Sequence, residues 1–150
     1  MPGISEILAT ARARGSQRNL SYAGELLPAE AFELLQNASA VKLVDVRTRA
    51  EWDFVGRIPG SVEIEWEFYP DGKPNAAFLE QLRRQVDPEA LVMFICRSGN
   101  RSHHAAVAAA AAGYSQSYNV LEGFEGKKDA HSHRNVVSGW RVAGLPWFQG

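Results

Sequence analysis

Residues 91–102 read LVMFICRSGNRS and combine an apolar run with a short polar turn that follows it directly. The apolar run, Leu91 to Ile95, is typical of a parallel strand that is covered on both faces. After the turn, Arg101 to Ala112 are strong helix formers, and Gly113 stands at the C-cap position. The stretch therefore predicts a strand, a tight turn and a helix, with Cys96 at the junction.

The same alternation of strand and helix extends in both directions from this stretch. Further short strands are predicted at 41–46, at 61–64 and at 118–121, and a loop at 70–74. Helices are expected from Ile4 to near Gly15, from Pro28 to near Asn37, from Thr48 to near Gly56 and from Phe78 to Val86. This order predicts an α/β domain with a parallel sheet, right-handed crossovers and helices on both faces. Ligands of such sheets bind at the carboxyl ends of the strands, where Cys96 would lie.

Length and composition predict one domain without a disulfide. The chain has 150 residues, of which 45% are hydrophobic and 22% charged, and its only cysteine is Cys96. We expect residues 1–20 to form a helical extension that packs on a domain of residues 21–150. The formal net charge of -1 argues against a nucleic-acid partner, and no apolar run is long enough for a membrane span. A single thiol and no secretory signal predict a cytoplasmic protein.

Cys96 is the candidate nucleophile. The turn can point backbone N–H groups inward, and the following helix adds the positive end of its dipole. Arg97 and Arg101 add formal charge, and Gly99 allows the backbone to curl, so the site favours a thiolate over a thiol. The alternative is that Cys96 is a small buried hydrophobic residue. The combination of strand, turn, arginines and helix favours the nucleophile.

Several separated motifs resemble those of the rhodanese family, over about residues 22–147. The matching segments are Asp45-Val46-Arg47, Glu51-Trp52, Gly56-Arg57-Ile58-Pro59-Gly60-Ser61, Cys96 to Ser102, Leu121-Glu122-Gly123, Trp140 and Gly144-Leu145-Pro146. The resemblance implies an open, mainly parallel five-stranded sheet with helices on both faces. It also implies a persulfide on the loop cysteine and transfer of sulfur to an acceptor, without a cofactor.

The length of the loop separates the activities within this superfamily. Four residues lie between Cys96 and Arg101, which makes the six-residue loop of sulfurtransferases, whereas the related phosphatases carry one residue more. We expect Cys96 to be catalytic. We expect the donor anion to be bound by Arg97, Ser98, Gly99, Asn100, Arg101 and Ser102.

The sequence departs from the family pattern near this site. Arg57 stands where the family often has histidine, which would place an additional cation at the edge of the site. Phe124 replaces the usual second glycine, and about a dozen residues are inserted before Trp140, so that the role of residues 124–139 is open. The aromatic residues that follow are expected to hold the carboxyl terminus on the core.

Other polar residues have weaker claims to the site. In resembling proteins, the pair Asp45 and Arg47 supports the active loop, and Asp45 could brace Arg101; an ordinary ion pair would use the same residues. His103 and His104 point in different directions on a helix, and His131 and His133 are expected in a solvated loop. No metal site is predicted.

The leading hypothesis is a sulfurtransferase that carries sulfane sulfur from thiosulfate or a similar anion, through a Cys96 persulfide, to an external thiol, protein thiol or cyanide. A cysteine-based phosphatase or arsenate reductase could use the same loop. A persulfide carrier or protein-docking module is a third possibility, in which residues 127–137 would bind a partner.

Overall fold

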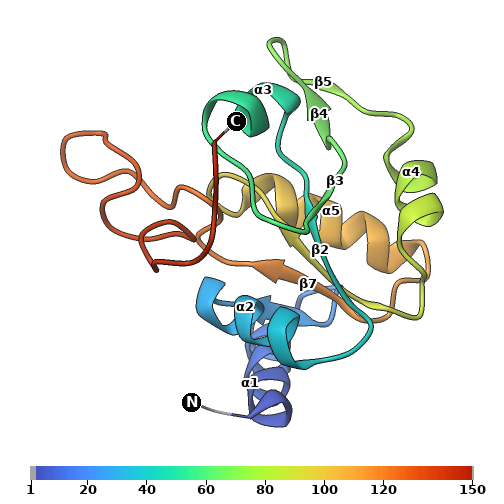
Figure 1. Cartoon of the computed structure of the whole chain (residues 1–150). Helices are drawn as coiled ribbons and strands as arrows, with labels where there is room; N and C mark the ends of the chain where they lie inside the picture. Colours follow the sequence, from blue (N-terminus) through green and yellow to red (C-terminus); the bar gives the residue numbers. More distant parts are fainter. Residues whose placement is uncertain (1–2, 150) are drawn as a thin grey trace.

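The computed structural model describes residues 3–149, which form a five-stranded parallel sheet with helices on both faces (Figure 1). The strand order is β1-β7-β6-β2-β3, and every neighbouring pair is parallel. The strands are β1 (Gly24–Leu26), β2 (Val41–Asp45), β3 (Val62–Glu63), β6 (Leu91–Ile95) and β7 (Ser117–Val120). The predicted α/β sheet is therefore confirmed.

Helices cover the two faces of this sheet. They are α1 (Ile4–Gln17), α2 (Pro28–Asn37), α3 (Arg49–Phe54), α4 (Phe78–Gln85) and α5 (Asn100–Ala111). Buried side chains of α1 and α2 pack on one face, and those of α4 and α5 pack on the other. Helix α3 is short and begins at the predicted cap, where the Thr48 hydroxyl accepts from the Glu51 N–H.

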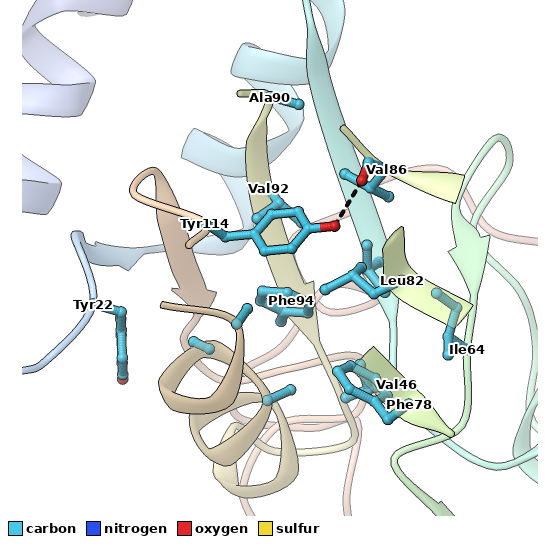
Figure 2. Close-up of a cluster of buried hydrophobic side chains, with 14 of the residues drawn as sticks. Tyr22, Val46, Ile64, Phe78, Leu82, Val86, Ala90, Val92, Phe94 and Tyr114 are labelled. Carbon is cyan, nitrogen blue, oxygen red and sulfur yellow. Dashed lines mark hydrogen bonds between the residues drawn. The ribbon is translucent and has the colours of Figure 1, made fainter. Parts of the chain in front are cut away.

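The central strand β6 is buried on both faces, as its apolar run predicts. Leu91, Met93 and Ile95 join the core under α1 and α2. Val92 and Phe94 alternate with them and join the core under α4 and α5. Figure 2 shows this second core, where the Tyr114 hydroxyl donates to the Val86 carbonyl at 2.7 Å. Cys96, the next residue in the alternation, belongs to the same face as Phe94.

Strand β1 and a small hairpin were not predicted from the sequence. Strand β1 has three residues and includes the buried Glu25, so it lacks an apolar run; its pairing with β7 and its contact with α1 make it a strand. The hairpin pairs β4 (Glu67–Phe68) with β5 (Lys73–Pro74), so the predicted loop at 70–74 covers most of its turn but was wrong at the two residues of β5. The strands of this hairpin have two residues each, too few for a period to be visible.

Helix α1 is longer than predicted and packs closely on the sheet. It continues through Gly15 to Gln17, and Gly15 lies against the next strand, where an added Cβ would be 2.8 Å from the Ala23 carbonyl oxygen and 3.0 Å from the Gly24 Cα. Ile7 and Ala11 are buried in the core beneath it. The division of the chain at residue 20 stays a prediction. Within residues 3–149, none of the helices is sufficiently long and apolar to cross a lipid bilayer.

The segment after β7 is held to the core by Trp140. This side chain is fully buried, packs edge-on against Phe32, and donates from Nε1 to the Pro146 carbonyl at 2.8 Å. Trp147 and Phe148 contribute less, because they remain 39% and 47% exposed. The segment therefore depends mainly on one indole.

Replacing Trp140 tests this assignment. Trp140→Ala is expected to lower the free energy of unfolding by about 3–5 kcal/mol, because it leaves a large cavity in the core. Trp147→Ala is the comparison variant and should cost about 2 kcal/mol, less than Trp140→Ala, because Trp147 is 39% exposed and buries less apolar surface. Urea unfolding of both variants measures the difference, and equal losses would contradict the assignment.

Candidate active site

Cys96 is the first residue after β6 and lies at the base of a tight turn. The residue is 1% exposed, and its Sγ accepts a hydrogen bond from the Gly99 N–H at 3.1 Å and contacts the Ser102 Oγ at 3.2 Å. Gly99 is the N-cap of α5 and has φ of 109°, a conformation that glycine adopts without strain. The sulfur thus lies within the turn, close to the N-terminus of a twelve-residue helix.

The segment after β7 holds the carbonyl groups of this turn. The Phe124 N–H donates to the Cys96 carbonyl at 2.8 Å, and the N–H groups of Glu125 and Gly126 donate to the Arg97 carbonyl at 2.9 and 3.2 Å. In a planar trans peptide, the carbonyl of one residue and the N–H of the following residue point in opposite directions. The N–H groups of Arg97 and Ser98 therefore point away from residues 124–126, so the turn presents donors that suit an anion.

Gly123 makes this arrangement possible because it lies directly against the turn. Its φ is +67°, and an added Cβ would come within 2.5 Å of the Arg97 carbonyl carbon and 2.6 Å of the Cys96 oxygen. No flexible side chain is available to move aside at these contacts. A glycine is therefore required at position 123, because the backbone there approaches the Cys96–Arg97 backbone too closely for a Cβ.

Arg101 is held by Glu51, a residue of the predicted helix start and of the Glu51-Trp52 segment that was not expected to contact it. Two guanidinium nitrogens donate to the two Glu51 carboxylate oxygens at 2.7 and 2.9 Å, and both side chains are mostly buried. Burial alone would raise the pKa of Glu51, but the hydrogen bond and charge of Arg101, with help from Thr48, lower the pKa to about 2. Burial alone would lower the pKa of Arg101, and Glu51 raises it above its ordinary value. The pair is therefore charged at neutral pH.

Asp45 and Arg47 form a fully buried ion pair at the end of β2. Arg47 donates to both Asp45 oxygens at 2.8–3.2 Å and to the Gly56 carbonyl at 2.7 Å. Of the two roles open to Asp45, the structure shows the ion pair with Arg47, and Glu51 instead of Asp45 contacts Arg101. The Arg47 guanidinium lies 4.1 Å from the centre of the Phe124 ring. The pair therefore reaches the active loop indirectly, through the residue whose N–H holds the Cys96 carbonyl.

The loop residues are brought together but divide between two clefts. A cleft of about 540 Å³ lies between α3, the β4–β5 hairpin and the loop, and it is lined by Arg97, Arg101 and Arg134 among others. A smaller cleft of about 240 Å³ is lined by Ser98, Gly99, Asn100, His103 and Asn119 among others. Ser102 lines neither cleft and is fully buried.

Arg57 lies outside both clefts, so the structure places it away from the predicted position at the site edge. Its guanidinium pairs with Asp53 at 2.9 Å and with Glu63 at 3.1 Å, and its backbone bridges to Phe148. It lines a separate cleft beside Trp52. The sequence alone did not show that the carboxylates of Asp53 and Glu63 pair with the Arg57 guanidinium.

His103 borders the smaller cleft, and His131 and His133 belong to the inserted loop. His103 lies 2.7 Å from the Tyr22 hydroxyl, and burial together with the charges of His104 and Arg18 lowers the pKa of His103. His131 and His133 donate their backbone N–H groups to the Asp129 carboxylate in the inserted loop. Within residues 3–149, no group of three or more potential ligands is arranged to hold a metal ion.

Comparison with known proteins agrees with this geometry. The family model of the rhodanese-like domain matches residues 28–130. The chain belongs to this family. Rhodanese-like domains include sulfurtransferases, so the match supports sulfur transfer as the general class of activity.

Relatives extend the match over most of this rhodanese-like domain. The crystal structure of Rv0390 from M. tuberculosis is 47% identical, with a TM-score of 0.79 over 86% of this chain and 99% of that one. RC0915 of Rickettsia conorii, described as uncharacterized, is 36% identical over 79% of this chain and 91% of its own length. The polysulfide-sulfur transferase of Wolinella succinogenes shares the fold, with 21% identity and a TM-score of 0.60 over 99% of this chain and 95% of that one.

Gly123→Ala tests whether close backbone contact shapes the active loop. We expect a loss of roughly 3 kcal/mol or more in the free energy of unfolding, since the added Cβ meets backbone atoms that must shift. Gly60→Ala is the control, because Gly60 also has positive φ but no atom within 4 Å of an added Cβ, and should cost only about 1–2 kcal/mol. Similar losses, measured by urea unfolding, would contradict the contact.

Glu51→Gln tests the ion pair through the pH dependence of stability. The pKa of Glu51 is lowered on folding, so its contribution of up to about 3 kcal/mol is present above pH about 4.5 and disappears as the pH falls toward about 2. The variant should therefore be less stable than wild type at pH 7 and nearly as stable near pH 2. Glu80→Gln, which removes an exposed pair with Arg84, should change little at any pH. A Glu51→Gln difference that does not vary with pH would rule out the ion pair.

Proposed function

We propose that this rhodanese-like domain is a sulfurtransferase that carries sulfur as a persulfide on Cys96. The observation that carries the proposal is the Gly99 N–H donating to Sγ within a turn whose carbonyls are held by residues 124–126. Such a turn stabilises negative charge at or just beyond the sulfur. The proposal also agrees with the name of the W. succinogenes protein, a polysulfide-sulfur transferase of the same fold.

Loading begins with attack by the Cys96 thiolate on the outer sulfur of thiosulfate or a similar sulfane donor. A sulfur–sulfur bond forms to Sγ, the bond between the two sulfur atoms of thiosulfate breaks, and sulfite leaves with its electron pair. The loop amides then face the anionic outer sulfur. The thiolate is the form of Cys96 that attacks, so its thiol proton is lost to solvent before this step.

Arg97 is the better candidate for binding the donor anion. Its side chain is exposed in the larger cleft, whereas two guanidinium nitrogens of Arg101 already bind Glu51. Arg101 contributes its charge near Cys96 and anchors α3 to α5. The donor is therefore held by the Arg97 side chain in the larger cleft and by the N–H groups of Arg97 and Ser98, which orient it for attack.

Discharge requires an acceptor from outside the chain. Cys96 is the only cysteine, so no second thiol can resolve the persulfide internally. A small thiol, a protein thiolate or cyanide attacks the outer sulfur, and the Cys96 thiolate leaves with the electron pair of the broken bond. This sequence of half-reactions gives ping-pong kinetics. A cytoplasmic location, where thiols remain reduced, suits such chemistry.

Phosphate chemistry is disfavoured by two features of the site. The loop from Cys96 to Arg101 has six residues, and the guanidinium that would clamp a transferring phosphoryl or arsenate group is paired with Glu51. The same pairing does not hinder sulfur transfer, because the outer sulfur of a persulfide is smaller and carries a single charge. A docking role for residues 127–137 stays a prediction, to which the exposure of Val136 and Val137 lends support.

Intact-protein mass spectrometry tests the proposed reaction. After incubation with thiosulfate and desalting, wild type is expected to gain one sulfur atom and to lose it on addition of dithiothreitol. Cys96→Ser should gain none while retaining the fold, and Ser117→Ala, which alters a buried hydroxyl bonded to Tyr114, should behave as wild type. Sulfur uptake by Cys96→Ser would refute the mechanism. Cys96-dependent hydrolysis of an aryl phosphate without sulfur uptake would support the phosphatase alternative.

A further inference from the structure

Asn119 links the active loop to the middle of the sheet, although no sequence motif marks it. It lies on β7, beside the central strand, and is 3% exposed. Its Nδ2 lies 3.2 Å from the Gly99 carbonyl oxygen, and its Oδ1 lies 2.6 Å from the Ser102 Oγ. Asn119 therefore contacts both residues that touch the Cys96 sulfur.

Hydrogen-bond accounting determines the direction of each contact. The Gly99 carbonyl can only accept, so it must face the Asn119 amide nitrogen, which leaves Oδ1 toward Ser102. Oδ1 can also only accept, so the Ser102 hydroxyl donates its single proton to Asn119. Ser102 has no proton left for a second donation.

Ser102 consequently presents only lone pairs to Cys96. The distance from its Oγ to Sγ is 3.2 Å, which allows a thiol S–H to donate to the hydroxyl oxygen. A thiolate in the same position would face an oxygen lone pair instead of a donor, leaving the Gly99 N–H as its nearest donor. The buried side of the site thus favours a neutral sulfur at Sγ.

We propose that Asn119 is a positioning residue that holds Ser102 as an acceptor and thereby biases Cys96 toward states without charge on Sγ. The persulfide is such a state, because its Sγ is a neutral bridging atom and its charge lies on the outer sulfur, toward the loop N–H groups. The assignment of the persulfide as the favoured state rests on the proposed function. The site would accordingly retain bound sulfur until an acceptor arrives, rather than release it to regenerate a free thiolate.

Other charged groups surround Cys96 and remain the same in the variants that test this proposal. The titratable and charged groups on the loop and on the elements packed against it include Arg97, Arg101, His103, His104, Asp45, Arg47, Glu51, Glu67, Tyr69, Asp71, Tyr22, Glu25, Arg18, Glu122, Glu125 and Arg134. Because Asn119 and Ser102 are uncharged, replacing them leaves this field in place. A change in thiolate formation between variants then reports the hydrogen bond to Sγ.

The direction of Ser102 is tested by titrating the Cys96 thiolate. Its ultraviolet absorbance, with Cys96→Ser as the blank, gives the midpoint pH of thiolate formation without requiring a reagent to reach the buried sulfur. In Asn119→Ala, the freed Ser102 hydroxyl can turn and donate to the thiolate, so the midpoint should fall by roughly one pH unit. The double variant Asn119→Ala/Ser102→Ala should lose this fall. A midpoint that is unchanged or higher in Asn119→Ala would overturn the proposal.

Ser102→Ala provides an independent test that leaves the bond between Asn119 and Gly99 in place. If the Ser102 hydroxyl only accepts, its removal should leave the midpoint pH of thiolate formation unchanged or lower it. If the hydroxyl donated to the thiolate, its removal would raise this midpoint. A raised midpoint therefore overturns the proposal even if Asn119→Ala folds poorly. Ser117→Ala, on the same strand but bonded to Tyr114, should keep the wild-type midpoint.

Discharge of the loaded enzyme tests the persulfide part separately. A better stabilised thiolate leaves faster, so persulfide on Asn119→Ala should transfer its sulfur to dithiothreitol several-fold faster than wild type. Equal or slower discharge would overturn the link to sulfur retention. If neither protein takes up sulfur, the proposed function fails, while the titration still decides the orientation of Ser102.

Discussion

The hydrogen bonds from the N–H groups of residues 124–126 to the carbonyls of Cys96 and Arg97 are the constraint on which the active loop depends. They turn the peptide groups of the loop so that the following N–H groups point the other way. They form because the chain after β7 passes directly over the end of β6, an approach that only Gly123 permits. An anion site is thus made from backbone groups, and no side chain has to reorganise when charge develops.

Two ion pairs stabilise this arrangement from neighbouring elements. Asp45 and Arg47 are fully buried and hydrogen-bond to each other, although Arg47 Nη1 has no hydrogen-bond partner within residues 3–149. The Arg47 guanidinium covers the ring of Phe124, which stands where the family pattern usually has glycine. Glu51 caps α3 and also holds Arg101, so that one carboxylate joins α3 to α5 beside the larger cleft. Removing one partner of such a pair leaves an uncompensated buried charge, so breaking either pair is strongly destabilising.

The buried side of Cys96 complements this backbone site. The loop N–H groups suit charge beyond the sulfur, whereas the Ser102 hydroxyl, oriented by Asn119, suits a neutral Sγ. Negative charge is therefore better accommodated on the outer sulfur of a persulfide than on Sγ. That asymmetry distinguishes a persulfide from a thiolate, and it accounts for a polar network that is otherwise costly to bury.

The sequence by itself determined the features that depend on neighbouring residues. The apolar run at 91–95, the capping box of Thr48 and Glu51, and the turn from Cys96 to Ser102 all follow from local patterns. Only the tertiary structure decided which distant side chains meet. Glu51 reaches Arg101, Asn119 reaches Ser102, and Arg57 is taken by Asp53 and Glu63 because the strand order and the packing of α3 bring them together. Strand β1 and the β4–β5 hairpin are likewise too short to have a period, and their partners make them strands.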